Sequence, residues 1–179
     1  MVRRLCDALR PNEYVEALED VDLQHLHDRG IRGILIDRDR TLTPWRSDEV
    51  SAEKLRWLEE AGKHFSVCIV SNTIFVNSLQ RLGRQLEIPV VSRWGLGRKP
   101  MPGAMKAGLR VVGVAADRAA MIGDQLFTDV LGGNLQGMYT VLVKPVPGPE
   151  FPATGIARVA ERGVMALMNI GLDENHKKG

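Results

Sequence analysis

The sequence predicts an α/β fold, in which a central parallel sheet lies between two layers of helices. Short apolar runs alternate along the chain with longer amphipathic segments, the order that crossover helices between parallel strands produce. The runs are continuously apolar, as strands buried on both faces are. The length of 179 residues suits one domain with a proper core. We therefore expect a three-layer, Rossmann-like sandwich that forms a single domain over residues 1–179.

Taken in chain order, five apolar runs are predicted as the strands of this sheet. They cover residues 33–36, 67–70, 89–91, 119–122 and 139–143. We expect each strand to be followed by a helix or a loop that returns the chain to the start of the next strand.

Three helices are predicted between these strands. Ser51 is a suitable N-cap for a helix that ends near Gly62. Pro102 suits the first turn of another helix, closed around Gly108. A further helix is predicted from apolar residues at helical spacing, which places one face toward the core: Phe75, Leu79, Leu82 and Leu86.

The two ends of the chain are predicted to extend this sandwich. Residues 1–30 are expected to form an N-terminal arm with one or two helices. Residues 145–179 begin with a loop rich in proline and glycine, followed by a helix near 156–168.

Composition excludes several classes of function. The net charge is +2, so no global charge indicates a nucleic-acid partner. No apolar stretch approaches the roughly 20 residues that cross a bilayer, and the N-terminus has no apolar core of a signal peptide. Two cysteines indicate neither a disulfide framework nor a zinc site. A cytoplasmic protein is expected, with at most peripheral contact with the inner face of the membrane.

Polar residues follow three of the predicted strands at the points where they end. These residues are Asp37, Ser71 and Asp124. Ligands of open parallel sheets bind beyond the carboxyl ends of the strands. Burying an unpaired carboxylate at this edge costs free energy. The three polar residues at the strand ends therefore indicate one shared site.

In chain order the candidate site comprises four short motifs. They read Asp37-x-Asp39-x-Thr41, then Ser71-Asn72, then Arg98-Lys99-Pro100, then Gly123-Asp124-Gln125-x-x-Thr128-Asp129. This series resembles the signature of the haloacid dehalogenase (HAD) superfamily of phosphohydrolases. The stretches "GDQLFTDVLGGNLQGMYTVLV" and "RKPMPGAMKAGL" are similar to YqeG-type phosphatases of subfamily IIIA, which are related to the mitochondrial phosphatidylglycerophosphate phosphatases. The similarity runs from about Arg10 to Val146.

The resemblance implies a Mg²⁺-dependent phosphomonoester hydrolase with a phosphoaspartate intermediate. Asp37 is implied as the nucleophile, and Asp39 as the general acid and base. Mg²⁺ would be held by the carboxylates of Asp37 and Asp124 and by the backbone carbonyl of Asp39. Ser71 would bind a phosphoryl oxygen and Lys99 would balance its charge. Asp129 would support metal-bound water or orient Lys99. Gly123 permits a sharp turn, and the remaining motif residues are supporting: Thr41, Asn72 and Gln125.

The chain departs from the subfamily in its charges near the site. Arginines stand at 38 and 40, where the subfamily has uncharged residues, and Thr73 and Leu135 replace an asparagine and a basic residue. We expect Arg38 and Arg40 to point to the rim. A substrate-binding rim of Arg40, Arg93 and Arg98 would suit a bulky anionic monoester, with the headgroup of phosphatidylglycerophosphate the leading candidate.

Other interpretations of these residues stay open at this point. An isolated aspartate pair usually belongs to a turn, Ser71 could cap the next helix, and Lys99 could be solvated. The substrate could be a small soluble phosphate, such as a sugar phosphate or a nucleotide. The chain could also be a pseudo-phosphatase that binds phosphate or a partner without turnover. A mutase is less favoured, because the spacings from Thr41 to Ser71 and from Ser71 to Lys99 leave no residues for a cap domain. The oligomeric state is open.

Overall fold

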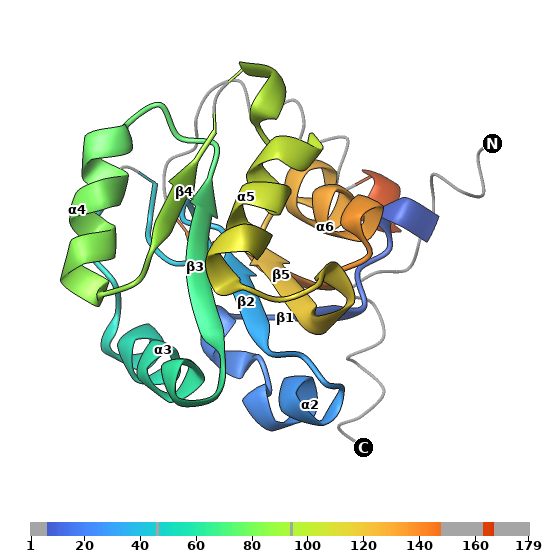
Figure 1. Cartoon of the computed structure of the whole chain (residues 1–179), viewed down its shortest axis with the longest axis horizontal. Helices are drawn as coiled ribbons and strands as arrows, with labels where there is room; N and C mark the ends of the chain where they lie inside the picture. Colours follow the sequence, from blue (N-terminus) through green and yellow to red (C-terminus); the bar gives the residue numbers. More distant parts are fainter. Residues whose placement is uncertain (1–6, 46, 94, 148–162, 167–179) are drawn as a thin grey trace.

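The computed structural model describes residues 7–45, 47–93, 95–147 and 163–166. Its centre is a six-stranded sheet in which every neighbouring pair is parallel, in the order β1-β6-β5-β2-β3-β4 (Figure 1). The strands are β1 (Glu13–Val15), β2 (Gly33–Ile36), β3 (Ser66–Ser71), β4 (Val90–Ser92), β5 (Ala119–Gly123) and β6 (Tyr139–Val143). The predicted α/β class is confirmed. All five predicted strands are present, within one residue of the expected ends.

Strand β1 was not predicted. It lies in the N-terminal arm, which was expected to be helical, and it pairs with β6 at the sheet edge through a register that joins Tyr14 to Leu142. With three residues it is too short to show a periodic pattern, and only Val15 among them is buried. The remainder of the described arm contains the short helical turn η1 (Leu18–Asp20) and helix α2 (Leu23–Asp28).

The helices that cover the sheet begin and end largely as expected. They are α3 (Ala52–His64), α4 (Val76–Leu86), α5 (Pro102–Val112) and α6 (Leu131–Gln136). Short turns η2 (Gly95–Gly97) and η3 (Ala116–Arg118) and the π-helical turn η4 (Leu126–Val130) join them to the strands. Ser51 caps α3 by accepting a hydrogen bond from the Lys54 amide.

Two details of the predicted helices are wrong. Helix α5 continues past Gly108 to a left-handed Gly113, because Gly108 is a packing residue: a Cβ there would lie 2.9 Å from the side chains of Leu35 and Val70. Phe75 precedes α4 and is 45% exposed, so it does not belong to the buried face formed by Leu79 and Leu82.

The two faces of the sheet form separate cores, as the alternation of side chains along a strand requires. Ile34 and Ile36 pack with α3 and α4, whereas Leu35 packs with α5 on the opposite face. Figure 1 shows α3 and α4 on one side of the sheet and α5 and α6 on the other. This is the predicted three-layer sandwich.

The connections that pass the carboxyl edge of the sheet are short. Among the described residues, only α3 and β3 lie between Thr41 and Ser71, and only α4, β4 and η2 lie between Ser71 and Lys99. The described part of the chain therefore has no inserted cap. Of the C-terminal helix expected near 156–168, residues 163–166 are described and are helical, and the rest lies outside the described residues. No helix in the described ranges is long and apolar enough to cross a membrane.

Candidate active site

Three adjacent strands deliver polar side chains to one edge of the sheet. Asp37 directly follows β2, Ser71 ends β3 and Asp124 directly follows β5. The order β5-β2-β3 places Asp37 in the middle, and its amide donates to the Ile122 carbonyl at 2.8 Å. The parallel register therefore brings together residues that are up to 87 positions apart in the sequence.

Three buried carboxylates form the centre of the site. Asp37, Asp124 and Asp129 are 4%, 3% and 1% exposed, and each offers an oxygen within 4.8 Å of the others. Lys99 is the buried cation among them. Its Nζ contacts Asp37 Oδ1 and lies 2.6 Å from Asp129 Oδ1. We call these four residues the acidic cluster.

Asn72 holds the backbone of Lys99 from both sides. Its Nδ2 donates to the Lys99 carbonyl at 3.0 Å, and its Oδ1 accepts from the Lys99 amide at 2.8 Å. The Lys99 ammonium also donates to the Val70 carbonyl at the end of β3. A loop residue is thus fixed against two strands, which explains how a lysine in an Arg-Lys-Pro loop becomes fully buried.

Asp129 is placed by the tight turn after β5. A Cβ at Gly123 would lie 2.3 Å from Asp129 Oδ2, so only glycine allows this approach. The same oxygen accepts a hydrogen bond from the Gln125 amide at 3.1 Å. One oxygen of Asp129 is therefore held by the backbone while the other faces Lys99.

Asp39 and Ser71 lie beside this cluster. Asp39 is half-buried, and burial raises the pKa of its carboxyl, opposed by the charges of Arg38 and Lys99 and by a hydrogen bond with Ser71. The Ser71 hydroxyl also accepts from the Thr73 amide, so it does not cap α4. Thr41 is fully buried, and its carbonyl accepts a hydrogen bond from Lys54 Nζ at 2.9 Å.

The electrostatics of the cluster favour a bound cation. Burial raises the pKa of Asp37 well above its usual range, and the neighbouring carboxylates add to this although Lys99 opposes it. Burial alone would lower the pKa of Lys99, but Asp129 and Asp37 outweigh it and the pKa is raised. Three carboxylates thus face one ammonium, and the buried Asp37 Oδ2 has no hydrogen-bond partner. A hard divalent cation such as Mg²⁺ matches this set of oxygen donors.

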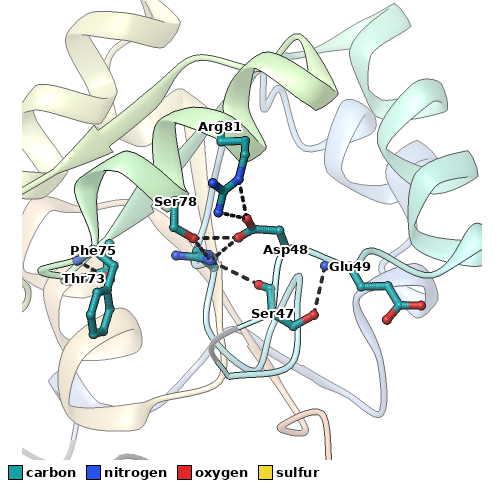
Figure 2. A network of polar contacts seen from close by, with 8 residues as sticks. Ser47, Asp48, Glu49, Thr73, Phe75, Ser78 and Arg81 are labelled. Atoms are coloured by element: carbon teal, nitrogen blue, oxygen red, sulfur yellow. Dashed lines mark hydrogen bonds and ion pairs between the residues drawn. The ribbon is translucent and has the colours of Figure 1, made fainter.

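Arg38 does not point to the rim, so that prediction is wrong. It is 2% exposed, and its Nη2 donates to Asp48 Oδ1 at 2.6 Å and to Ser78 Oγ at 2.7 Å. Arg81 binds the other oxygen of Asp48 through two donors, at 2.9 and 2.7 Å. Figure 2 shows Asp48 joined to both Ser78 and Arg81, which belong to α4. We call Arg38, Asp48, Ser78 and Arg81 the arginine clamp. It turns Arg38 inward because Asp48 supplies the counter-charge that a buried guanidinium requires.

The other arginines differ in their surroundings. Arg40 has a left-handed backbone with φ of 66°, is half-buried, and donates from Nε to the Val146 carbonyl at 3.1 Å. Arg93 and Arg98 are exposed, on the segment between β4 and Lys99. The predicted rim thus comprises two exposed arginines and one attached to the segment after β6.

Sequence reasoning missed several residues that shape the site. Asp48, Ser78 and Arg81 lie in no recognised motif, and their roles depend on the approach of α4 to the loop after β2. Lys54 was not singled out, although a lysine one turn into an otherwise amphipathic helix and 7% exposed is unusual. Its position three residues after the N-cap Ser51 was the available signal.

Sequence comparisons relate this chain to known phosphatases. The sequence model of the family described as mitochondrial PGP phosphatase matches residues 3–146. The probable phosphatase YqeG of Bacillus subtilis is 33% identical over 162 residues, which cover 88% of this chain and 90% of that protein. The chloroplastic/mitochondrial phosphatidylglycerophosphate phosphatase 1 of Arabidopsis thaliana is 27% identical over 164 residues, or 88% of this chain, and the match spans only 47% of the plant protein.

Solved structures support the fold. An uncharacterised protein from Listeria monocytogenes superposes with a TM-score of 0.53 at 16% identity, covering 78% of this chain and all of that one. A haloacid dehalogenase-like hydrolase from Streptococcus pneumoniae gives a TM-score of 0.51 at 15% identity, over 63% of this chain and 84% of that one. Because the family match extends over most of the chain and includes all four motifs, the chain belongs to the mitochondrial PGP phosphatase family and is a phosphatase of the HAD type.

Proposed function

We propose that the protein is a Mg²⁺-dependent phosphomonoester hydrolase that acts through a phosphoaspartate on Asp37, with phosphatidylglycerophosphate as its substrate. One observation carries the reaction type: a buried carboxylate at the end of a central strand contacts a lysine and has an oxygen without a hydrogen-bond partner. The family match and the plant relative support the substrate.

In the first step the Asp37 carboxylate attacks phosphorus. A P–O bond to Asp37 forms and the P–O bond to the leaving alcohol breaks. Asp39 donates a proton to the leaving oxygen, and the raised pKa of its carboxyl favours the protonated form that this step needs. Lys99 and Ser71 would bind the phosphoryl oxygens, and Asn72 positions Lys99 by holding its backbone.

In the second step water attacks the phosphorus of the aspartyl phosphate. Asp39, now ionised, accepts a proton from this water, and the bond between phosphorus and Asp37 breaks. Inorganic phosphate leaves, and the Asp37 carboxylate and protonated Asp39 are restored. No other reactant is required.

Mg²⁺ would be held by the carboxylates of Asp37 and Asp124 and the carbonyl of Asp39. When bound, it supplies positive charge that neutralises the carboxylates and the phosphoryl oxygens. Asp129 already contacts Lys99 and the Gln125 amide, so we assign it to orienting Lys99.

The experiment that tests the substrate compares kcat/KM for phosphatidylglycerophosphate in mixed micelles with kcat/KM for soluble sugar phosphates and nucleotides, with Mg²⁺ present. The lipid is expected to be preferred. If a soluble ester is preferred by tenfold or more, about 1.4 kcal/mol in transition-state stabilisation, the lipid assignment is wrong. Arg40→Asn, tested on the same panel, is expected to lower kcat/KM for the lipid more than for the soluble esters.

A further inference from the structure

The end of the connection between β3 and α4 and the first residue of α4 expose three consecutive apolar side chains. Ile74, Phe75 and Val76 are 56%, 45% and 41% exposed, and we call them the apolar tip. Met101, on the neighbouring loop, is 45% exposed. Of the seven large apolar side chains exposed in the described part of the chain, four therefore lie in these two loops or at the first residue of α4. Such clustering, unlike single exposed apolar residues, indicates an interaction surface.

Hydrogen bonds hold the two loops side by side. Asn72 binds the backbone of Lys99, and the Ser92 hydroxyl donates to the Thr73 carbonyl at 3.0 Å. In Figure 1 both loops lie beyond the arrowheads of β3 and β4, at the edge of the sheet where the site residues gather. The apolar tip thus lies at the same edge of the sheet as the acidic cluster and begins two residues after Asn72.

The apolar tip is held in a defined conformation. The Ser71 hydroxyl accepts from the Thr73 amide, and the Thr73 hydroxyl accepts from the Phe75 amide, both at 3.1 Å. From the tip to Arg81, α4 lines an open hollow of about 430 Å³ on the surface. The apolar side chains are therefore presented by an ordered turn, so little conformational freedom is lost when they are buried.

Two exposed positive charges lie near the tip. Arg81, which lines the hollow, is paired with Asp48, and the buried Lys99 is paired with Asp37 and Asp129, so these two cations are already balanced. Arg93 and Arg98 are exposed beside the tip. The exposed Glu49 lies on the side of Asp48 away from Phe75 in Figure 2. An apolar tip with flanking arginines complements an anionic bilayer, because the apolar side chains can enter the acyl boundary while the arginines bind the anionic headgroups.

We propose that the apolar tip, Met101 and the exposed Arg93 and Arg98 form a docking surface for an anionic lipid bilayer. This inference rests on the proposed function. Docking of the apolar tip would bring the acidic cluster to the level of the lipid headgroups, where the proposed substrate lies. A second copy of the chain is a poorer occupant, because a two-fold contact through this surface would oppose like charges.

The test is sedimentation of the full chain with vesicles of phosphatidylcholine, with or without phosphatidylglycerol. The wild type is expected to bind the anionic vesicles, and the double variant Ile74→Ser/Phe75→Ser to bind at least about tenfold more weakly. The matched control is Val111→Ser/Leu135→Ser, which removes two equally exposed apolar side chains, 45% and 58%, near the opposite edge of the sheet. It is expected to bind as the wild type does.

Turnover of p-nitrophenyl phosphate shows whether the active site survives in the double variant, and the single variants Ile74→Ser and Phe75→Ser replace it if it does not fold. Unchanged vesicle binding by the tip variants, or no binding by the wild type, would overturn the proposal. The proposal would also be overturned if light scattering showed a dimeric wild type and a monomeric tip variant while both bound vesicles equally in sedimentation. A wild type that binds vesicles without hydrolysing any monoester would instead refute the proposed function and leave the docking surface standing.

Discussion

Two ionic networks, one buried and one that reaches the surface, meet at adjacent residues, and their charges are balanced differently. In the acidic cluster, Asp37, Asp124 and Asp129 face one lysine, and an oxygen of Asp37 has no hydrogen-bond partner. In the arginine clamp, both oxygens of Asp48 are bound by arginines and by Ser78. Asp37 belongs to the first network and Arg38 to the second. Two consecutive residues of the loop after β2 therefore differ in role: Asp37 belongs to the candidate active site and Arg38 to a structural ion pair.

The pKa values of the two central aspartates show the same contrast. Burial raises the pKa of Asp37. Partial burial acts in the same direction on Asp48, but hydrogen bonds from Ser78 and Arg81 and the charge of Arg38 hold its pKa below the usual range. In the arginine clamp, the donors around Asp48 lower the energy of its charged form and stabilise the fold. A network that lacks positive charge keeps an electrostatic cost, which a bound cation can remove.

The largest expected effect comes from making the same substitution in each network. Asp37→Asn should lower kcat by about 10⁴-fold or more, because the amide is not a nucleophile. Asp48→Asn should keep kcat within about tenfold, because Asp48 contacts no group of the acidic cluster. Phosphate release from p-nitrophenyl phosphate measures both. Near-normal turnover by Asp37→Asn would refute the phosphoaspartate, and an equal loss in both variants would show that the networks act as one.

The second largest effect is expected from the removal of Mg²⁺, which should affect the acidic cluster and leave the arginine clamp unchanged. EDTA should abolish turnover, and excess Mg²⁺ should restore it, since the unbalanced carboxylates require a cation. Mg²⁺ should also raise the melting temperature of the wild type by linkage. The rise in melting temperature should be smaller in Asp124→Asn than in the wild type, and in Asp48→Asn it should equal that of the wild type. Full activity in excess EDTA, or an equal rise in all three proteins, would count against the metal site.

Lysine substitutions compare a charge inside the acidic cluster with one outside it. Lys99→Met should lower kcat by about 10²–10³-fold and destabilise the fold by about 3 kcal/mol, because Asp37 and Asp129 lose their buried partner. Lys54→Met removes another buried ammonium, which binds the Thr41 carbonyl. It should cost stability but change kcat by less than about tenfold. Kinetics and urea unfolding measure the two effects, and similar kcat values for both variants would contradict the assigned role of Lys99.

The smallest expected effect is the pH dependence of the arginine clamp. Asp48→Asn should destabilise the fold by about 2 kcal/mol at pH 7, because buried Arg38 loses its counter-charge. Since the folded pKa of Asp48 is lowered, its stabilising contribution is present above the unfolded pKa near 3.8 and is lost as pH falls through the lower folded value. The difference between wild type and variant should thus be constant from pH 7 to about 5 and shrink below pH 3.8. A difference that does not change with pH would show that the lost contact is not ionic.

The sequence by itself determined the strands of the central sheet and the residues at their carboxyl ends. Continuous apolar runs are sufficient to predict buried parallel strands, and parallel strands carry Asp37, Ser71 and Asp124 to a common edge. The close packing of Asp129 against Gly123 also lies within seven residues of chain, where local geometry dominates.

Only the tertiary structure decided the features that join distant segments. Strand β1 depends on pairing with β6, which lies more than 120 residues away, and its own three residues show no pattern. Arg38 is buried because Asp48 and Ser78 surround it, and no local signal reveals that α4 lies close enough to do so. Lys99 is buried because Asn72 holds its backbone. A charged side chain can be either solvated or buried, and the free energy that decides between them comes from partners that only the folded chain brings within contact distance.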